Sequence, residues 1–172
     1  MDARGLTMLA ATSGLVAGAV WLSETLDRKP EVTESTAAAI RAELSFFVEF
    51  IEDPVEREAL SDKPVPLCIG SSAPLDFDLL EDRLARSFLR PVPIIGCRRR
   101  TVEGDFGMFG AMTYWFDETG EEAGQLRIKA VNCPTVRRCI VDIDSVGAGM
   151  RYEVERTGDN WTVTGQETRW IV

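Results

Sequence analysis

Clustered arginines are the residues of this sequence best suited to binding chemistry. Residues 98–100 are three consecutive arginines, and residues 137–138 are two more. Guanidinium groups bind carboxylates and phosphates through paired N–H donors. Because side chains alternate along a strand, we expect Arg98 and Arg100 to share one face and hold an anionic ligand, with residues 137–138 nearby if the two strands are neighbours. The alternative is a solvated strand whose arginines protect an exposed edge.

Asp142 and Asp144 are the candidates for acid–base chemistry. They share one face of a predicted strand, and they could act as paired carboxylates if burial raised the pKa of one of them. The neighbouring sequence favours a structural role instead. In the hairpin register that places opposite charges face to face, Arg127 lies opposite Asp144 and Lys129 lies opposite Asp142.

Tyr114 and Trp115 are the candidates for an apolar ligand site. They stand in an aromatic-rich stretch with Phe106, Phe109 and Phe116, interrupted by glycines. Such a stretch can line a pocket for a small apolar molecule. It can also form part of an ordinary core, which is the simpler interpretation.

The absence of histidine removes much of the usual catalytic chemistry. The sequence contains no His, which excludes Ser-His-Asp sites, Cys-His sites and histidine-ligated zinc. The four cysteines include no Cys-x-x-Cys pair, so we expect no zinc or other metal site. No phosphate-binding loop, dinucleotide fingerprint or hydrolase motif occurs, and we therefore expect no cofactor.

The cysteines also allow a prediction about disulfides. In the hairpin register given above, Cys133 lies on the charged face and Cys139 on the apolar face. A disulfide between them would need a bulge, so we predict that they are not bonded to each other. If the protein is exported, we expect Cys97 to pair with Cys133 or Cys139; free, buried thiols are the alternative. Cys68 is expected to pack as a small hydrophobe.

The charge of the chain excludes one class of partner. It has 28 acidic and 19 basic residues, a formal net charge of −9. This charge opposes the phosphate attraction that supplies nonspecific nucleic-acid binding, and we expect no nucleic-acid partner. Negative charge also favours approach to a basic protein surface, although solubility explains it equally well.

Residues 5–22 form an uncharged, largely apolar segment. Three interpretations stay open: a signal peptide cleaved after the small residues 17–19, a membrane anchor helix, and a packing helix. We expect export or membrane tethering, with the periplasmic side preferred, although the flanking charges do not decide the orientation. The residues expected to contact the membrane are Leu9, Leu15, Val16, Val20, Trp21 and Leu22.

The rest of the chain reads as a linker followed by one domain. Residues 23–34 are polar and typical of a linker, and residues 35–172 have the length of a single domain. Apolar spacing predicts helices at 31–52, 54–60 and 76–88. Alternation and turn residues predict strands near 65–70, 92–102, 108–117, 125–132, 138–146, 150–157 and 161–171. The strand at 65–70 contains proline and is expected at a sheet edge.

The order of these elements predicts an α+β fold, with an N-terminal apolar helix and then helices packed on a curved antiparallel sheet. Helix, short helix, strand, helix and a meander that ends in Tyr152-x-Val154 and Trp161-x-Val163 resemble the cystatin-like cone of nuclear-transport-factor-like proteins. The resemblance covers residues 31–172 and implies a long helix lying in a bent sheet, with a pocket between them. This group includes isomerases, dehydratases and noncatalytic binding modules. The His–Asp pair frequent among the dehydratases is absent here.

These observations predict a noncatalytic accessory or binding domain, acting as a subunit or interaction partner of a membrane or envelope assembly. Its expected partner is a protein, and a small anionic or apolar ligand is a further option. One alternative is a small-molecule enzyme with a carboxylate base, in which Arg98 or Arg100 holds the substrate. Another is an acidic immunity-type inhibitor that neutralises a basic toxin.

Overall fold

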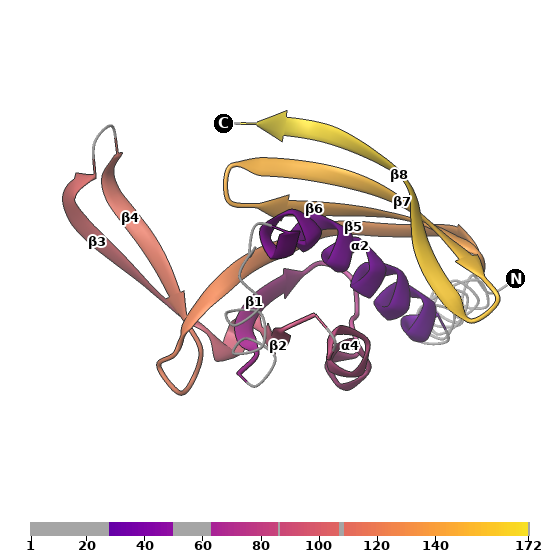
Figure 1. The fold of residues 1–172 in the computed structure, drawn as a ribbon, viewed down its shortest axis with the longest axis horizontal. Helices are drawn as coiled ribbons and strands as arrows, with labels where there is room; N and C mark the ends of the chain where they lie inside the picture. The colour runs from indigo at the N-terminus through magenta and orange to yellow at the C-terminus, as the bar shows by residue number, and fades with distance from the viewer. Residues whose placement is uncertain (1–27, 50–62, 86, 107–108, 172) are drawn as a thin grey trace, which may run out of the picture.

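The computed structural model describes residues 28–49, 63–85, 87–106 and 109–171 (Figure 1). Strands make up 57% of these residues and α-helices 23%. This corrects the predicted fold class: the described chain is built mainly on one eight-stranded mixed sheet, with two α-helices and no apolar N-terminal helix. Only the packing of helix against sheet agrees with the prediction.

The described residues form two α-helices, one 3-10 helix and eight strands. They are α2 (Lys29–Glu49), β1 (Val65–Ser71), α4 (Phe77–Leu84), β2 (Leu89–Pro93), the 3-10 helix η1 (Ile94–Gly96), β3 (Arg98–Phe106), β4 (Phe109–Phe116), β5 (Glu122–Thr135), β6 (Arg138–Ser145), β7 (Ala148–Thr157) and β8 (Asn160–Ile171). α2 begins inside the range predicted as a linker, and the predicted helix at 54–60 lies outside the described residues.

The sheet is mixed because one strand enters it through a helical crossover. The strand order is β2-β1-β5-β6-β7-β8, with β4 joined to the start of β5 and β3 joined to β4. β1 runs parallel to both β2 and β5. The connection from β1 to β2 passes through α4, as a parallel pair requires. The strand predicted for an edge therefore lies between two neighbours, and the prediction of an antiparallel sheet is wrong at this end.

The core forms where α2 crosses the sheet. α2 lies between α4 and the antiparallel strands β5–β8 (Figure 1). Residues 37–39 of α2 are alanines, at most 5% exposed, and these small side chains let the helix approach its neighbours closely. α4 begins at its cap residue Asp76, whose side chain accepts a hydrogen bond from the Leu79 amide, and it buries Leu80 and Leu84.

The hairpin between β5 and β6 confirms half of the predicted register. Arg127 lies opposite Asp144 as expected, but a register shift follows and places Ala130, instead of Lys129, opposite Asp142. An extra residue in one strand of a pair produces this kind of shift. The predicted pairing of Lys129 with Asp142 is therefore wrong.

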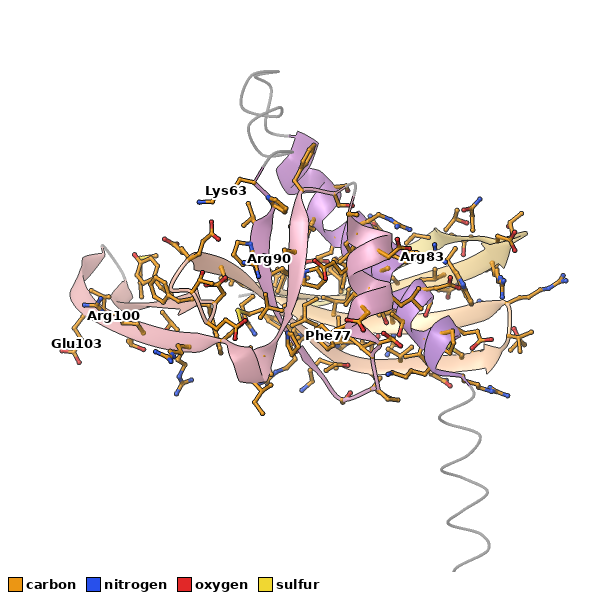
Figure 2. The ribbon with its side chains drawn as sticks, turned by 90° about the horizontal axis from the view of Figure 1, so that it is seen from below. Lys63, Phe77, Arg83, Arg90, Arg100 and Glu103 are labelled. Atoms are coloured by element: carbon orange, nitrogen blue, oxygen red, sulfur yellow. A yellow bond between two sulfur atoms is a disulfide. The ribbon has the colours of Figure 1, made fainter. Side chains whose placement is uncertain are left out.

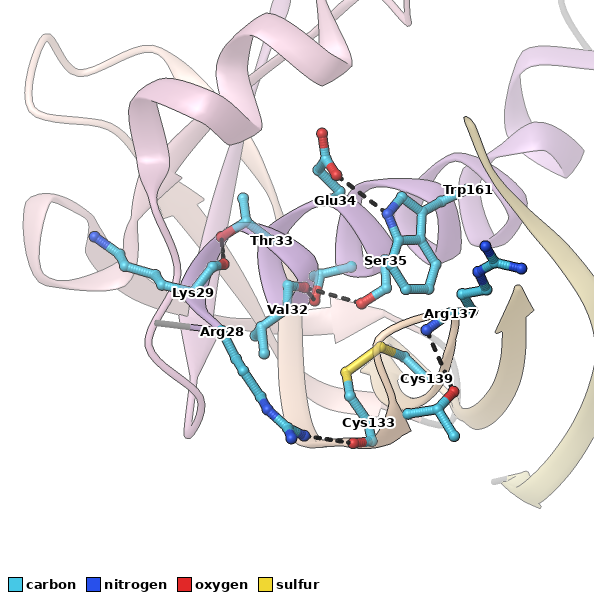
Figure 3. Close-up of a disulfide and its surroundings, with 12 residues drawn as sticks. Arg28, Lys29, Val32, Thr33, Glu34, Ser35, Cys133, Arg137, Cys139 and Trp161 are labelled. Carbon is cyan, nitrogen blue, oxygen red and sulfur yellow. Dashed lines mark hydrogen bonds between the residues drawn. A yellow bond between two sulfur atoms is a disulfide. The ribbon is translucent and has the colours of Figure 1, made fainter. Parts of the chain in front are cut away.

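The same register shift brings together two cysteines that the sequence argument kept apart, because beyond it Asn132 lies opposite Ile140, and Cys133 and Cys139 are the next residues along the two strands. Cys133 and Cys139 are bonded, with their Cα atoms 4.0 Å apart (Figure 3). The other disulfide joins Cys68 to Cys97. The predictions that Cys133 and Cys139 are unbonded, that Cys97 pairs with one of them, and that Cys68 is a free hydrophobe are all wrong.

The predicted transmembrane signal-anchor is also corrected. No helix among the residues that the structure describes is both long and apolar enough to cross a membrane. The segment 5–22, to which the prediction was assigned, lies outside the described residues, together with its six candidate membrane residues.

Candidate binding site on the β3–β4 arm

β3 and β4 form a two-stranded arm that projects beyond the rest of the sheet (Figure 1). β4 joins β5 only where Trp115 lies opposite Ala123 and Phe116 lies opposite Glu122. Within the described part of the chain, β3 pairs with β4 alone. Figure 2 shows Arg100 and Glu103 on this arm, far from Arg83 on α4. The arm therefore offers surfaces that the core does not cover.

The pairing of β3 with β4 sorts the side chains of the arm onto two faces. Directly opposite residues share a face of an antiparallel pair. Arg98 pairs with Phe116, Arg100 with Tyr114 and Val102 with Met112. On the other face, the hydroxyls of Thr101 and Thr113 lie 3.2 Å apart in a cross-strand hydrogen bond. We call the first set the arginine–aromatic face; its residues are Arg98, Arg100, Val102, Met112, Tyr114 and Phe116.

The three arginines of β3 are available for an external partner. Arg98, Arg99 and Arg100 are exposed, and none of them forms an ion pair with a described residue. Six arginines outside the arm do form such pairs: Arg83, Arg90, Arg138, Arg151, Arg156 and Arg169. An unpaired guanidinium cluster in an acidic protein attracts carboxylates.

A cleft of about 430 Å³ lies at the base of the arm. Its walls are the side chains of residues 98–100, the ring of Phe116 and the turn formed by residues 117–120. The cleft thus combines three guanidinium groups with the carboxylates of Asp117 and Glu118, an aromatic surface and a tight turn. Since Arg90 binds the Asp117 carboxylate, positive charge is in excess, which suits an acidic chain better than an apolar molecule.

Asp117 holds the turn from which the arm projects. Its buried carboxylate accepts hydrogen bonds from the Thr119 amide at 2.9 Å, the Thr119 hydroxyl at 2.7 Å and the Glu121 amide at 2.9 Å. Arg90 on β2 donates to the other oxygen at 2.6 Å. The Arg90 guanidinium and these donors hold the pKa of Asp117 far below its ordinary value. Gly120 closes the turn with a positive φ of 86°.

A disulfide fixes the other strand of the arm. Cys97 stands directly before Arg98, the first residue of β3, and is bonded to Cys68 in the buried strand β1. β3 is therefore covalently tied to the core at its first residue, and β4 is fixed by the turn at Asp117. The base of the arm is held on both sides, while its outer part has no neighbour among the described residues.

The structure brings together only part of the predicted site. Arg98 and Arg100 share a face as predicted, and the pairing adds Tyr114 to it, whereas Trp115 lies on the opposite face, across from Arg99. The cluster at residues 137–138 lies at the far end of β5 from the arm, because β4 meets the start of β5 and this cluster follows its end. The two strands are not neighbours, so the condition on which the two arginine clusters were expected to approach each other is not met.

Asp142 and Asp144 belong to a separate cluster on the sheet. Arg151 on β7 donates two hydrogen bonds to the Asp142 carboxylate, of 2.8 and 3.0 Å. Arg169 on β8 lies 3.3 Å from Asp144, and the indole of Trp170 donates to the same carboxylate at 3.2 Å. These contacts tie β6, β7 and β8 together. The geometry is that of a structural ion-pair network, in which both carboxylates have guanidinium partners.

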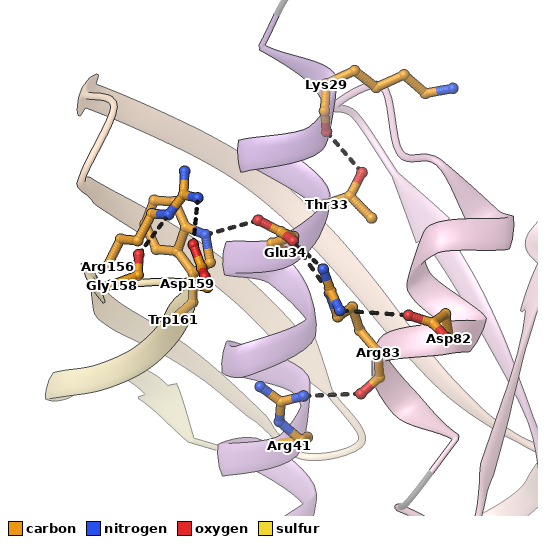
Figure 4. A network of polar contacts seen from close by, with 10 residues as sticks. All are labelled: Lys29, Thr33, Glu34, Arg41, Asp82, Arg83, Arg156, Gly158, Asp159 and Trp161. Atoms are coloured by element: carbon orange, nitrogen blue, oxygen red, sulfur yellow. Dashed lines mark hydrogen bonds and ion pairs between the residues drawn. The ribbon is translucent and has the colours of Figure 1, made fainter.

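Sequence reasoning missed a polar network beside α4. Glu34 on α2 accepts a hydrogen bond from the Trp161 indole at 3.1 Å and forms an ion pair with Arg83 (Figure 4). Arg41 donates to the Arg83 carbonyl at 2.9 Å. The partners are separated by 42 to 127 residues in the sequence, so no local pattern could have revealed them. This network joins α2, α4 and β8.

A second hollow, of about 430 Å³, lies between α2, β1 and β5. Its described lining is almost entirely aliphatic, and only Gln125 and Ser145 contribute polar side chains. No titratable side chain belongs to the described lining, which therefore supplies no general acid or base. In the described ranges, no group of three potential ligands could hold a metal ion.

No protein-family profile, curated protein or solved structure matches this chain. The resemblance to the cystatin-like cone therefore stays a prediction. Function has to be inferred from the arm and the disulfides themselves.

Proposed function

We propose that this protein is a noncatalytic binding domain of an oxidising, extracytoplasmic compartment, where it serves as an accessory subunit or interaction partner of an envelope assembly. One observation carries the proposal: the arginine–aromatic face stands on a projecting arm, where Arg98, Arg100 and Met112 are exposed and Val102, Tyr114 and Phe116 are half-buried. The arm is the contact surface for a protein partner.

The composition of this face is that of an interface centre. Arginine, tyrosine and other aromatic residues dominate the binding energy of protein contacts, because they offer a large area and directed hydrogen bonds. A two-stranded ribbon is at best marginally stable alone in water. The arm therefore gains from a partner that covers it, while its base is already held by Asp117 and the disulfide at Cys97.

The disulfides support the proposal that the protein works in an oxidising compartment. All four cysteines are joined in two bonds, and structural disulfides are rare in the reducing cytosol. Alkylation of the protein in freshly lysed host cells, followed by intact-mass measurement, tests this part. We expect no alkylated cysteine; four alkylated cysteines would contradict an oxidising compartment.

The enzymatic alternative has less support. The described lining of the aliphatic hollow supplies no titratable side chain, and Asp142 and Asp144 are bound by arginines of β7 and β8. Arg98 and Arg100 lie on the arm, away from either group. An inhibitor that neutralises a basic toxin would need an acidic contact surface, whereas the projecting surface here is basic.

Cross-linking in the host tests the arm as the contact surface. The double variant Arg98→Glu/Arg100→Glu reverses both charges of the arginine–aromatic face. The matched control, Lys129→Glu/Arg137→Glu, makes the same charge change at two exposed residues outside the arm that form no ion pair with described residues. We expect wild type and control to form the same cross-linked species and the arm variant to lose it. Equal cross-linking by all three would refute the proposal.

A further inference from the structure

The outer edge of β3 is a free edge for strand addition. Over Arg98–Phe106, β3 has hydrogen-bonding partners on one side only within the described chain. The backbone N–H and C=O groups of the other side face outward. Such an edge binds extended peptides, because the backbone supplies affinity and the alternating side chains supply specificity.

The arginines of β3 specify the charge of the added strand. Arg98 and Arg100 lie on one face and Arg99 on the other, so an incoming strand satisfies all three only if it carries acids on both of its faces. Adjacent residues of a strand point to opposite faces. The complementary segment therefore contains at least three consecutive acidic residues.

The charge of the whole protein sharpens this selectivity. The chain carries a formal net charge of −9, so an acidic segment is repelled by most of the surface. The arm is where three guanidinium groups stand together without described ion-pair partners. An acidic segment is thus directed to the three arginines of the arm.

A second copy of this chain fits the edge less well. If β3 paired antiparallel with β3 of another copy, the register that sets Arg98 opposite Asp105 and Arg100 opposite Glu103 would leave Arg99 opposite Gly104. One guanidinium group of each copy would then stay without a carboxylate, whereas three consecutive acids provide a carboxylate for each arginine. The charge pattern therefore favours a different protein.

We propose that the free edge of β3 binds, as an added strand, an extended segment of a partner protein that contains three or more consecutive acidic residues. This inference rests on the proposed function, since it names the chemistry of the partner at the same arm. The added strand completes a three-stranded ribbon, with its carboxylates against Arg98, Arg99 and Arg100.

A peptide titration on the full-length, disulfide-bonded chain tests the inference. The probe is a fluorescein-labelled peptide in which valine and threonine flank three central glutamates, and the control peptide has glutamines instead. Fluorescence anisotropy should show binding of the glutamate peptide that weakens with added salt. We expect Arg98→Glu/Arg100→Glu to weaken binding roughly tenfold or more and Lys129→Glu/Arg137→Glu to leave it unchanged. Hydrogen exchange should slow at the amides of β3.

Four outcomes would overturn the inference. They are equal affinity for the two peptides, unchanged binding by the arm variant, exchange that is not slowed in β3, and dimerisation of the wild type through β3 in sedimentation. Circular dichroism melts of both variants ensure that a loss of binding is not a loss of folding. The two proposals can fail separately. If the arm variant loses its cross-link in the host but the wild type does not bind the glutamate peptide, the proposed function stands and this inference fails.

Discussion

Replacing Cys68 and Cys97 together with alanine should cost more stability than replacing Cys133 and Cys139, and it should also loosen the arm. The two disulfides are matched in burial, since each has one fully buried and one half-buried cysteine. They differ in the length of chain that they close. The comparison therefore isolates loop length from the loss of buried sulfur.

The expected difference in the free energy of unfolding follows from the two sequence separations, which are 29 for Cys68–Cys97 and 6 for Cys133–Cys139. A disulfide restricts the unfolded chain, and the restriction grows with the logarithm of loop length. For these separations the chain-entropy relation gives about 3.6 and about 2.2 kcal/mol. The larger disulfide should therefore contribute roughly 1.4 kcal/mol more to the free energy of unfolding, a factor of about ten in the folding equilibrium.

Urea unfolding followed by tryptophan fluorescence measures this difference, because Trp161 is buried in the core. Both double variants and the wild type are unfolded under the same conditions, and their slopes are compared to confirm a common unfolded state. Hydrogen exchange reports on the arm separately. We expect faster exchange at β3 when Cys97 is replaced, since β3 then loses its covalent tie to β1, and no change at β3 when Cys133 and Cys139 are replaced.

Two results would refute the reasoning. One is a larger loss of stability in the variant that lacks Cys133–Cys139. The other is unchanged exchange of the β3 amides in the variant that lacks Cys68–Cys97. The first result would mean that loop length does not set the relative contributions of the two disulfides, and the second would mean that the arm is held chiefly by the turn at Asp117.

Three further predictions concern contacts outside the disulfides. Tyr152→Phe keeps the buried ring but removes the hydroxyl that donates to Glu43 at 2.5 Å, so urea unfolding should show a loss of about 1.5–3 kcal/mol. Gly149→Ala places a methyl group against the Trp170 indole, and the same assay should show a loss of about 1–3 kcal/mol. The lowered pKa of Asp117 means that its stabilising effect is complete above its ordinary pKa of 3.8 and is lost as the pH falls below it. Asp117→Asn should therefore unfold with a weaker dependence on pH in this acidic range.

Local patterns predicted the helices and most strands of the described chain, because their signals lie within a few neighbouring residues. Apolar spacing located α2 and α4, and Asp76 caps α4 at the residue where the helix was expected to start. Alternation located β5 to β8. The parallel position of β1 between β2 and β5 could not be found in this way, since strand order depends on a crossover that no local pattern encodes.

The start of the pairing between β5 and β6 could be predicted from the sequence, but the register shifts further along the two strands could not. The charges of Arg127 and Asp144 correctly fixed the start of the pairing between β5 and β6. One extra residue near Lys129 then moved the partner of Asp142, and its guanidinium ligands came from β7 and β8 instead. A bulge leaves no charge or apolar signature of its own. The same irregularity of β5 explains why Cys133 reaches Cys139, although the unshifted register would place them on opposite faces of the hairpin.

The part of the site that could be predicted is the part that depends on the alternation of side chains between the two faces of one hairpin. Arg98, Arg100 and Tyr114 share a face because they lie at alternate positions of two paired strands. Whether that face would be buried was a different question. It depended on how much of β4 pairs with β5, and only Trp115 and Phe116 do so.

This short junction makes binding separable from folding. The buried hydrophobic cluster draws on α2, α4 and the strands β1 and β5–β8, and none of the side chains described in β3 and β4 belongs to it. Charge reversal at Arg98 and Arg100 therefore removes no core contact and breaks no ion pair with a described residue. Such variants should melt like the wild type while losing the partner. A coupled loss of stability and binding would show that the arm is part of the cooperative unit, and the charge of its arginines would then have to be tested through the salt dependence of binding in the unmodified protein.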